Sequence, residues 1–210
     1  HTRLLPAQSR IIEYVGGVAA KMTCSIKRWY PARMTPKQFY DWQTSGGTDD
    51  VMRLVDCLER ADVSWCAIGG VAVNHWADEP LVTPDVDFVV SADDLERTIA
   101  VLEEAGFRSV RFDWSIDFEG SSALSIQLST ADFYREFLPR AVPGDIHGIL
   151  MRVASLEDTL QGKIKAWSES TRRQSKRIKD LMDIVRMVEA HPHLWDSLTP
   201  ELKSQVERPE

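Results

Sequence analysis

Apolar residues recur at steps of three and four between Val51 and Leu58, with polar residues between them. This spacing places the apolar side chains on one face, so the pattern predicts an amphipathic helix. Two short, largely apolar segments, Trp65–Ile68 and Val86–Val90, have the length of buried strands. Because helices and strands alternate along the chain, we expect an α/β fold with a mixed sheet flanked by helices.

Another helix is predicted after Ser91, whose hydroxyl can cap it together with Asp94 three residues later. Its apolar stripe ends at Gly106, a residue type that commonly terminates helices. Beyond it, Phe107–Phe112 and Ala123–Leu128 alternate between apolar and polar residues. These segments predict two strands joined by a polar hairpin.

The last third of the sequence predicts helices. Ser155 caps a helix that extends to about Trp167, a second helix runs over Ser175–Ala190, and Thr199-Pro200 starts a short final one. The expected core stripe of the second helix consists of Ile178, Leu181, Met182, Val185 and Val188.

The first 47 residues are harder to interpret. Thr35-Pro36 is typical of a helix start, and Gly46-Gly47 of a helix end. Ile11–Val18 indicates a further amphipathic segment. We therefore expect an N-terminal arm of open role over residues 1–47, an α/β domain over 48–153 and a helical subdomain over 154–210.

Composition narrows the functional classes. The 210-residue chain is 43% hydrophobic, enough for a core, and its formal net charge of −7 argues against a general nucleic-acid coat protein without excluding a local basic groove. No apolar run approaches the roughly 18 residues of a membrane span, and no signal peptide is visible. We therefore expect no membrane contact. The three cysteines lack metal-ligand spacing, which suits a reducing compartment, so we expect a cytoplasmic protein.

The candidate catalytic and binding residues are concentrated around the helix predicted to begin with Val71–Trp76. Gly69 and Gly70 precede it, and glycines before a helix N-terminus let a phosphate approach the backbone. Asp85 and Asp87 open the following strand and, as residues i and i+2, face the same side. Such carboxylates repel unless a cation lies between them, and Mg²⁺ binds carboxylates together with substrate phosphates.

A Gly-Gly turn followed by an Asp-x-Asp pair resembles the nucleotidyltransferase superfamily of the polymerase-β type, closest to bacterial stand-alone AbiEii-toxin-like nucleotidyltransferases. The resemblance covers Asp49–Pro192. It implies a polymerase-β-type mixed sheet with a helical C-terminal subdomain. It also implies that Gly69 and Gly70 hold a triphosphate, while Asp85 and Asp87 bind Mg²⁺ or Mn²⁺ and act in catalysis.

Two lysines on the helix after Ser155 occupy different faces: Lys163 falls within the apolar stripe and Lys165 opposite it. An ammonium on a packing face either reaches the rim or finds a partner, and both readings stay open. The family resemblance favours contact between Lys163 and the nucleotide phosphates. It also implies a catalytic or structural role for Asp180. Asn74 is a further nucleotide-binding candidate.

The sequence departs from the family pattern at Gln127, where a third metal-binding aspartate is expected. An amide oxygen can bind a cation, but an amide brings no charge and is a poor base. We retain Gln127 as a metal ligand and expect any catalytic base elsewhere. Asp180 is the leading candidate, ahead of Asp113, Asp117 and Glu119.

A basic run extends over Arg172–Lys179. It is as typical of a solvated helix start as of a groove for a polyanionic acceptor such as RNA. We expect Mg²⁺-dependent transfer of a nucleotidyl group from an NTP to RNA, protein or a small molecule, in a toxin-like protein with an antitoxin partner. The alternative, which Gln127 favours, is a catalytically degenerate nucleotide-sensing or partner-binding protein on the same fold.

Overall fold

The computed structural model describes residues 11–15, 18–22, 41, 46–79, 81, 83, 85–146 and 148–208. The chain divides into two compact units, His1–Thr35 and Pro36–Glu210. In the first unit, β1 (Ile11–Val15) and β2 (Val18–Met22) pair antiparallel. The helix predicted to start at Thr35-Pro36 lies outside the described residues, apart from Asp41. Within the described ranges, no helix is long and apolar enough to cross a membrane.

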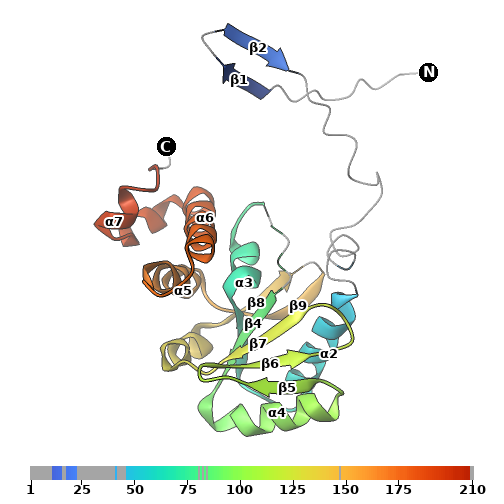
Figure 1. Cartoon of the computed structure of the whole chain (residues 1–210). Helices are drawn as coiled ribbons and strands as arrows, with labels where there is room; N and C mark the ends of the chain where they lie inside the picture. Colours follow the sequence, from blue (N-terminus) through green and yellow to red (C-terminus); the bar gives the residue numbers. More distant parts are fainter. Residues whose placement is uncertain are drawn as a thin grey trace, which may run out of the picture. The chain divides into compact units, whose positions relative to one another are not determined.

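The second unit is built on a seven-stranded sheet with the order β5-β6-β7-β4-β3-β9-β8 (Figure 1). Its strands are β3 (Trp65–Ile68), β4 (Asp85–Val90), β5 (Arg108–Arg111), β6 (Ser115–Glu119), β7 (Ser125–Ser129), β8 (Val142–Ile146) and β9 (Ile149–Val153). The central β4 is antiparallel to β3 and parallel to β7, and β3 is parallel to β9. The predicted mixed sheet is therefore confirmed.

Helices and 3₁₀ turns pack on both faces of this sheet and against one another. They are α2 (Gly47–Arg60), α3 (Gly69–Trp76), α4 (Leu95–Glu104), α5 (Leu156–Ser168), α6 (Gln174–Ala190) and α7 (Pro200–Lys203), with 3₁₀ turns η2 (Ala92–Asp94), η3 (Asp132–Arg140) and η4 (Pro192–Ser197). The predicted caps are confirmed, because the hydroxyls of Ser91, Ser155 and Thr199 accept the N–H three residues later at 3.2, 3.2 and 3.3 Å.

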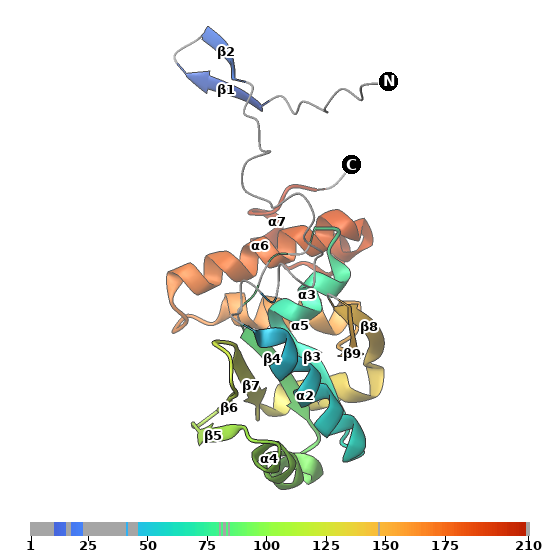
Figure 2. The ribbon, with the colours of Figure 1, turned by 90° about the vertical axis from the view of Figure 1, so that its right-hand side faces the viewer.

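The apolar residues form three clusters. The main one packs α2 and α4 against one face of the central strands. A smaller cluster joins η3 to the opposite face through Phe137 and Leu138. The third lies among α3, α5, α6 and α7, with α5 and α6 side by side (Figure 2). The predicted helical C-terminal part is thus present, and α3 links it to the sheet.

The alternation of β4 decides where its aspartates point. Val86 and Phe88 are buried against α2 and α4, whereas Val89 packs on the other face with η3. Successive strand residues alternate between faces, so Asp85 and Asp87 share the face of Val89. The two carboxylates therefore lie on the side of the sheet that carries η3.

The segment predicted as a polar hairpin between two strands contains a third strand, β6. Its Ile116 and Phe118 are buried, but two apolar residues in a short polar stretch are a weak strand signal. The sequence pattern also does not predict η3, β8 and β9. Pro143 and Gly144 lie inside β8, and these residue types normally argue against a strand. They are tolerated here because β8 is at the sheet edge.

The predicted core stripe of α6 is wrong at two of its five positions, because Ile178 and Met182 are 60% and 43% exposed. Val188 is buried as predicted, Leu181 and Val185 pack against the same cluster, and the structure also buries Ile184 and Met187. The buried face of α6 also contains two aspartates. A prediction that assigns charged residues to the surface therefore places that part of the face toward solvent. The orientation of α6 follows from ion pairs as well as from apolar packing.

Asp50 connects α2 to the turn between β6 and β7. Its buried carboxylate accepts hydrogen bonds from the backbone N–H and hydroxyl groups of Ser121 and Ser122. Burial alone would raise the pKa of Asp50, but these hydrogen bonds lower it below the ordinary 3.8. Gly120 provides the space, because a β-carbon there would lie 2.4 Å from Asp50 Oδ2.

We predict that Asp50→Asn lowers the free energy of unfolding at pH 7 by about 1 to 3 kcal/mol, because an amide nitrogen would face hydrogen-bond donors. A group with a depressed folded pKa stabilises above its ordinary pKa, so the difference should shrink as the pH falls below 3.8. Urea denaturation at several pH values measures it. Asp56→Asn is the control, because Asp56 forms an exposed 2.8 Å ion pair on the same helix. Equal losses for both variants would contradict the prediction.

Candidate active site

Three neighbouring strands align polar side chains on the η3 side of the sheet. Asp85 lies opposite Ser125 and Asp87 opposite Gln127 in the parallel β4–β7 pair, and Asp117 of β6 lies opposite Gln127. Gln127 Nε2 donates to Asp117 Oδ1 at 2.9 Å. Since the amide nitrogen is held by Asp117, Gln127 Oε1 is the atom left for the cavity that Gln127 lines.

The glycine pair at the start of α3 is in close contact with the aspartate strand. Gly69 has φ +65°, and a β-carbon there would lie 2.2 Å from Asp87 Oδ2. A β-carbon on Gly70 would lie 3.0 Å from Thr83 Oγ1, and the Thr83 hydroxyl donates to the Asp85 carbonyl at 3.3 Å. Both glycines therefore allow the segment that carries the aspartates to approach α3, a requirement additional to any phosphate contact.

In the absence of a cation, the ionised form of the Asp87 carboxyl is electrostatically unfavourable. Burial, and then the Asp85 carboxylate, raise the pKa of Asp87 to about 6, although nearby lysines oppose the shift. Within the described ranges, no three His, Cys, Asp or Glu side chains gather as a metal site. Two carboxylates and the amide oxygen of Gln127 are hard ligands that fit Mg²⁺ if phosphates and water complete its shell.

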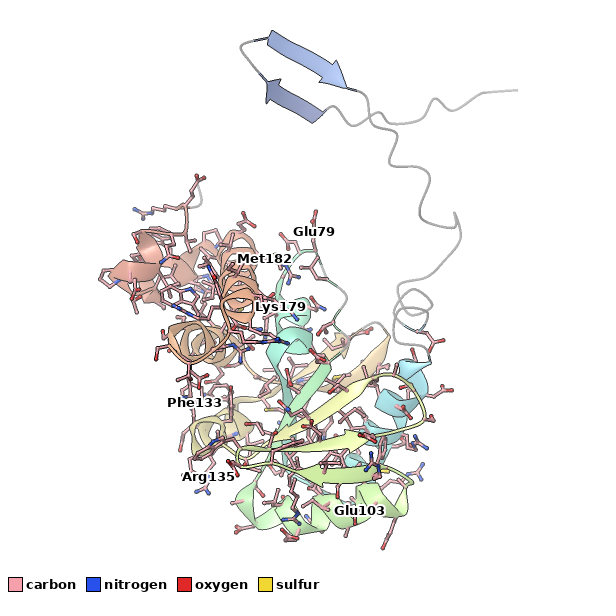
Figure 3. The ribbon with its side chains drawn as sticks, viewed as in Figure 1. Glu79, Glu103, Phe133, Arg135, Lys179 and Met182 are labelled. Carbon is pink, nitrogen blue, oxygen red and sulfur yellow. The ribbon has the colours of Figure 1, made fainter. Side chains whose placement is uncertain are left out.

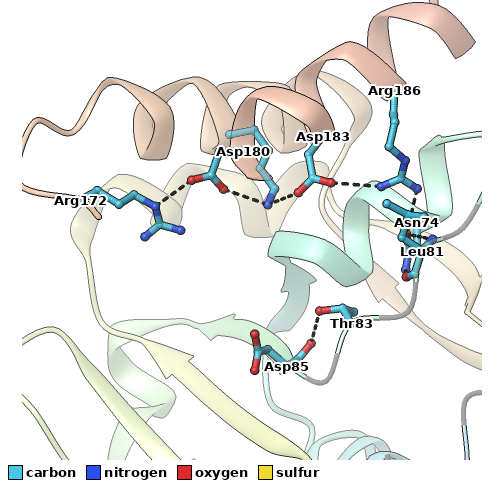
Figure 4. Close-up of polar contacts among 9 residues, drawn as sticks. Asn74, Leu81, Thr83, Asp85, Arg172, Asp180, Asp183 and Arg186 are labelled. Atoms are coloured by element: carbon cyan, nitrogen blue, oxygen red, sulfur yellow. Dashed lines mark hydrogen bonds and ion pairs between the residues drawn. The ribbon is translucent and has the colours of Figure 1, made fainter. Parts of the chain in front are cut away.

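A chain of buried ion pairs runs along α6 beside these strands (Figure 4). The Lys163 ammonium lies 3.3 Å from Asp180 Oδ1 and 2.6 Å from Asp183 Oδ2. Arg172 Nε contacts Asp180 Oδ2 at 2.7 Å, and Arg186 Nη1 contacts Asp183 Oδ1 at 3.1 Å. Asp183 is thus buried and ion-paired. Because each oxygen of Asp180 already contacts a cation, this arrangement does not favour Asp180 as a base.

Asn74 does not lie in the cleft. Its Oδ1 accepts the Leu81 N–H at 2.9 Å and the Arg186 Nη2 at 3.1 Å, and its amide donates to the Leu81 carbonyl. Arg186 also donates to the Glu79 carbonyl. Asn74 therefore fixes the segment leading to Asp85, and the expected nucleotide contact by Asn74 is not supported by its position.

Two adjoining cavities, of about 310 and 170 Å³, lie between the sheet and the helices. They share Asp87, Gln127, Lys163, Arg172 and Asp180, and so form one cleft. The larger cavity, the polar end, also includes Gly70, Thr83, Asp85, Ser125, Lys176 and Lys179. The smaller cavity, the aromatic end, includes Ile68, Gly69, Tyr134, Phe137, Gly162 and Ala166 among its lining. The cleft thus combines the three expected metal ligands with four cationic side chains.

The basic run divides between structural and cleft positions. Lys176 and Lys179 line the polar end, and Figure 3 shows Lys179 on the side of α6 that faces the strands. Arg172 pairs with Asp180, and Arg177 Nε donates to the Trp167 carbonyl at 2.7 Å. Most of the run therefore serves the cleft and the α5–α6 junction, which leaves little of it for an outer groove.

The expected separation of the two lysines on α5 agrees with their surroundings. Lys163 is buried in the cleft, whereas Lys165 is exposed and lies 5.2 Å from the centre of the Phe133 ring. Tyr134 and Phe137 of η3 were not predicted from the sequence as cleft residues. The aromatic repeat Phe133, Tyr134 and Phe137 was the available signal.

The fold is shared with solved structures of low sequence identity. The antibiotic-resistance factor ANT(2'')-Ia is 14% identical, with a TM-score of 0.51 over 76% of this chain and 88% of that chain. JHP933 from Helicobacter pylori is 17% identical, with a TM-score of 0.51 over 78% of this chain and 72% of that chain. These similarities, together with the mixed sheet and helical C-terminal part, define a nucleotidyltransferase fold.

The family assignment comes from the sequence itself. Residues 71–203, more than half of the chain, match the model of the family described as "Nucleotidyl transferase AbiEii toxin, Type IV TA system". The chain therefore belongs to the AbiEii nucleotidyltransferase toxin family, which confirms the resemblance found in the sequence. A search of curated proteins finds no match.

We predict that Asp87→Asn stabilises the metal-free protein, and that the gain increases between pH 4 and pH 8. The raised pKa means that folding favours the protonated carboxyl, so the stability of the wild type is lost as the pH rises through about 6. The expected gain at pH 8 is about 2 to 3 kcal/mol. Thermal unfolding with a chelator measures it, with Asp93→Asn at an exposed position as the control. A gain independent of pH would contradict this cause.

A second prediction concerns the charge missing at Gln127. Gln127→Asp should tighten Mn²⁺ binding to the nucleotide-free protein, because Gln127 lies opposite Asp87 and a third carboxylate would add charge at that position. Calorimetric titration measures the affinity. Ser125→Asp, two residues away on the same face, adds the same charge opposite Asp85. Equal effects of the two variants would indicate general electrostatics instead of a specific ligand position.

Proposed function

We propose that this protein transfers a nucleotidyl group from an NTP to an acceptor, with Mg²⁺ or Mn²⁺ bound by Asp85, Asp87 and Gln127. The observation that carries the proposal is the polar end of the cleft. There, two carboxylates on one strand face lie in the same cavity as four cationic side chains. That combination suits a metal-bound triphosphate, since the carboxylates hold the cation and the cations neutralise the phosphates.

Each residue has a definite part in this proposal. When bound, Mg²⁺ would activate the acceptor oxygen and neutralise charge on the leaving pyrophosphate. Lys163, Lys176 and Lys179 bind the phosphates, and Gly69 and Gly70 keep the backbone close to them. Asp180 orients Lys163 and Arg172 toward the cleft. The acceptor oxygen bonds to the α-phosphorus, the bond to the β-phosphate breaks, and the acceptor proton passes to solvent.

The site residues indicate the identity of the acceptor less directly. The solved complex of ANT(2'')-Ia contains adenylyl-2''-tobramycin, a nucleotidylated small molecule. A small-molecule acceptor is one candidate for this chain, and RNA or protein reaching the cleft past Lys176 and Lys179 is another. An antitoxin partner is part of the proposal because the family is that of a toxin from a type IV system.

One observation favours a second function. Gln127 replaces the third carboxylate, and Lys163 already contacts two aspartates. A protein with these features can bind a nucleotide without transferring it. The second candidate is thus a nucleotide-sensing or partner-binding protein on the same fold.

Calorimetry with Mg²⁺ and non-hydrolysable NTPs tests the first step. The wild type should bind at least one NTP, and Asp85→Asn should weaken binding about tenfold or more, because it removes a charged metal ligand. Asp93→Asn, at an exposed position on η2, is the matched control and should bind like the wild type. Equal affinity of the wild type and Asp85→Asn would refute the metal assignment.

Transfer is tested separately, by incubating the wild type with each α-labelled NTP and cellular RNA, protein or small-molecule fractions. Label that enters an acceptor only with wild-type protein supports the transferase. NTP binding without any transfer would select the sensing function instead.

A further inference from the structure

The aromatic end of the cleft has a different chemistry from the polar end. Besides the five shared residues, its lining includes Tyr134 and Phe137 of η3, two small residues of α5, Gly162 and Ala166, and the polar residues Ser129, Asp158 and Thr159. Lys176 and Lys179 line only the polar end. A phosphate chain is therefore favoured at one end of the cleft, and a flat group with polar edges at the other.

The aromatic surface is firmly held. The Tyr134 and Phe137 rings meet edge to face, with their centres 5.2 Å apart, and Phe133 packs on Phe137 at 5.3 Å. Phe137 is only 3% exposed. Burial, and then the Asp87 carboxylate, raise the pKa of Tyr134, so its hydroxyl stays protonated and can donate a hydrogen bond.

Two small residues of α5 keep this space open. Gly162 and Ala166 are four residues apart and therefore lie on the same face of the helix. A β-carbon on Gly162 would lie 3.7 Å from ring atoms of both Phe137 and Tyr134, which is ordinary contact. The cavity of about 170 Å³ is smaller than the roughly 300 Å³ or more of a site for a drug-sized ligand. It suits a single ring system.

We propose that the aromatic end holds the nucleobase of the NTP, against Tyr134 and beside Gly162 and Ala166. This inference rests on the proposed function, because the shared residues at the junction would hold the α-phosphate. An NTP then extends from the four cations through Asp85 and Asp87 to the aromatic rings. The Tyr134 ring contacts the base, while the Oε1 of Gln127 remains with the metal.

The test compares Mg²⁺-bound inorganic tripolyphosphate with Mg²⁺-bound non-hydrolysable NTPs by calorimetry on the full chain. Wild-type protein should bind at least one NTP about tenfold more tightly than tripolyphosphate, since base–aromatic contacts contribute that much. Tyr134→Leu should remove most of this advantage and leave the affinity for tripolyphosphate within about twofold, because the polar end is unchanged.

The Gly162→Ala variant distinguishes a loss of NTP binding from a loss of folding. Alanine is favoured over glycine inside a helix, so this variant should unfold at a higher temperature than the wild type. Its methyl group nevertheless enters the space beside Tyr134, so NTP affinity should fall severalfold while tripolyphosphate affinity is kept. Gln161→Ala, on the exposed side of α5, is the control and should leave both affinities unchanged.

The outcomes distinguish this inference from the proposed function. If neither NTPs nor tripolyphosphate bind the wild type, the proposed function fails. If tripolyphosphate and every NTP bind equally tightly, or if Tyr134→Leu and Gly162→Ala leave NTP affinity unchanged, the nucleobase assignment is overturned and the proposed function survives. Loss of transfer with unchanged NTP binding in these variants would assign the aromatic end to the acceptor, and would also overturn the proposal.

Discussion

The interaction on which the rest of the site depends is the buried row of alternating charges from Arg172 to Arg186. Two carboxylates and three cations lie side by side there, and removing one partner of a buried pair leaves an unpaired charge at a cost of several kcal/mol. The row fixes the rotation of α6, joins α5 to α6, and reaches the segment before Asp85 through Asn74 and Glu79. The helical part and the aspartate strand are thereby held in one arrangement.

Much of the fold could be predicted because its signals are local. The caps at Ser91, Ser155 and Thr199 define helix starts without reference to the rest of the chain. The strands around Gly69 and Asp87 are short apolar runs bounded by turn residues. By contrast, the strand that carries Asp117 shows only two buried apolar residues, and the edge strand β8 contains Pro143. Such elements are stabilised by their neighbours, which a local pattern does not contain.

The site residues likewise divide into those that the sequence predicts and those that it does not. Asp85, Asp87, Gln127, Lys163 and Asp180 were selected as candidates from the sequence, and the structure brings them to one cleft. Whether they bind metal and nucleotide stays a prediction. Asn74 lies outside the cleft because its amide is engaged by the backbone of Leu81, seven residues along the chain, and by the distant Arg186 side chain. Tyr134 was missed because its aromatic neighbours Phe133 and Phe137 indicate an apolar surface but do not indicate that η3 folds back over the open face of the sheet.

The contact between Gly69 and Asp87 has a consequence for how this site can evolve. Position 69 cannot acquire any side chain unless the Asp87 carboxylate moves or is lost, since even a β-carbon would overlap it. Loss of the acidic residue alone would not release the glycine, because the φ of +65° at position 69 strains any residue with a side chain. Among related sequences, the dependence should therefore run one way: a side chain at 69 requires loss of the carboxylate, whereas loss of the carboxylate does not require loss of the glycine.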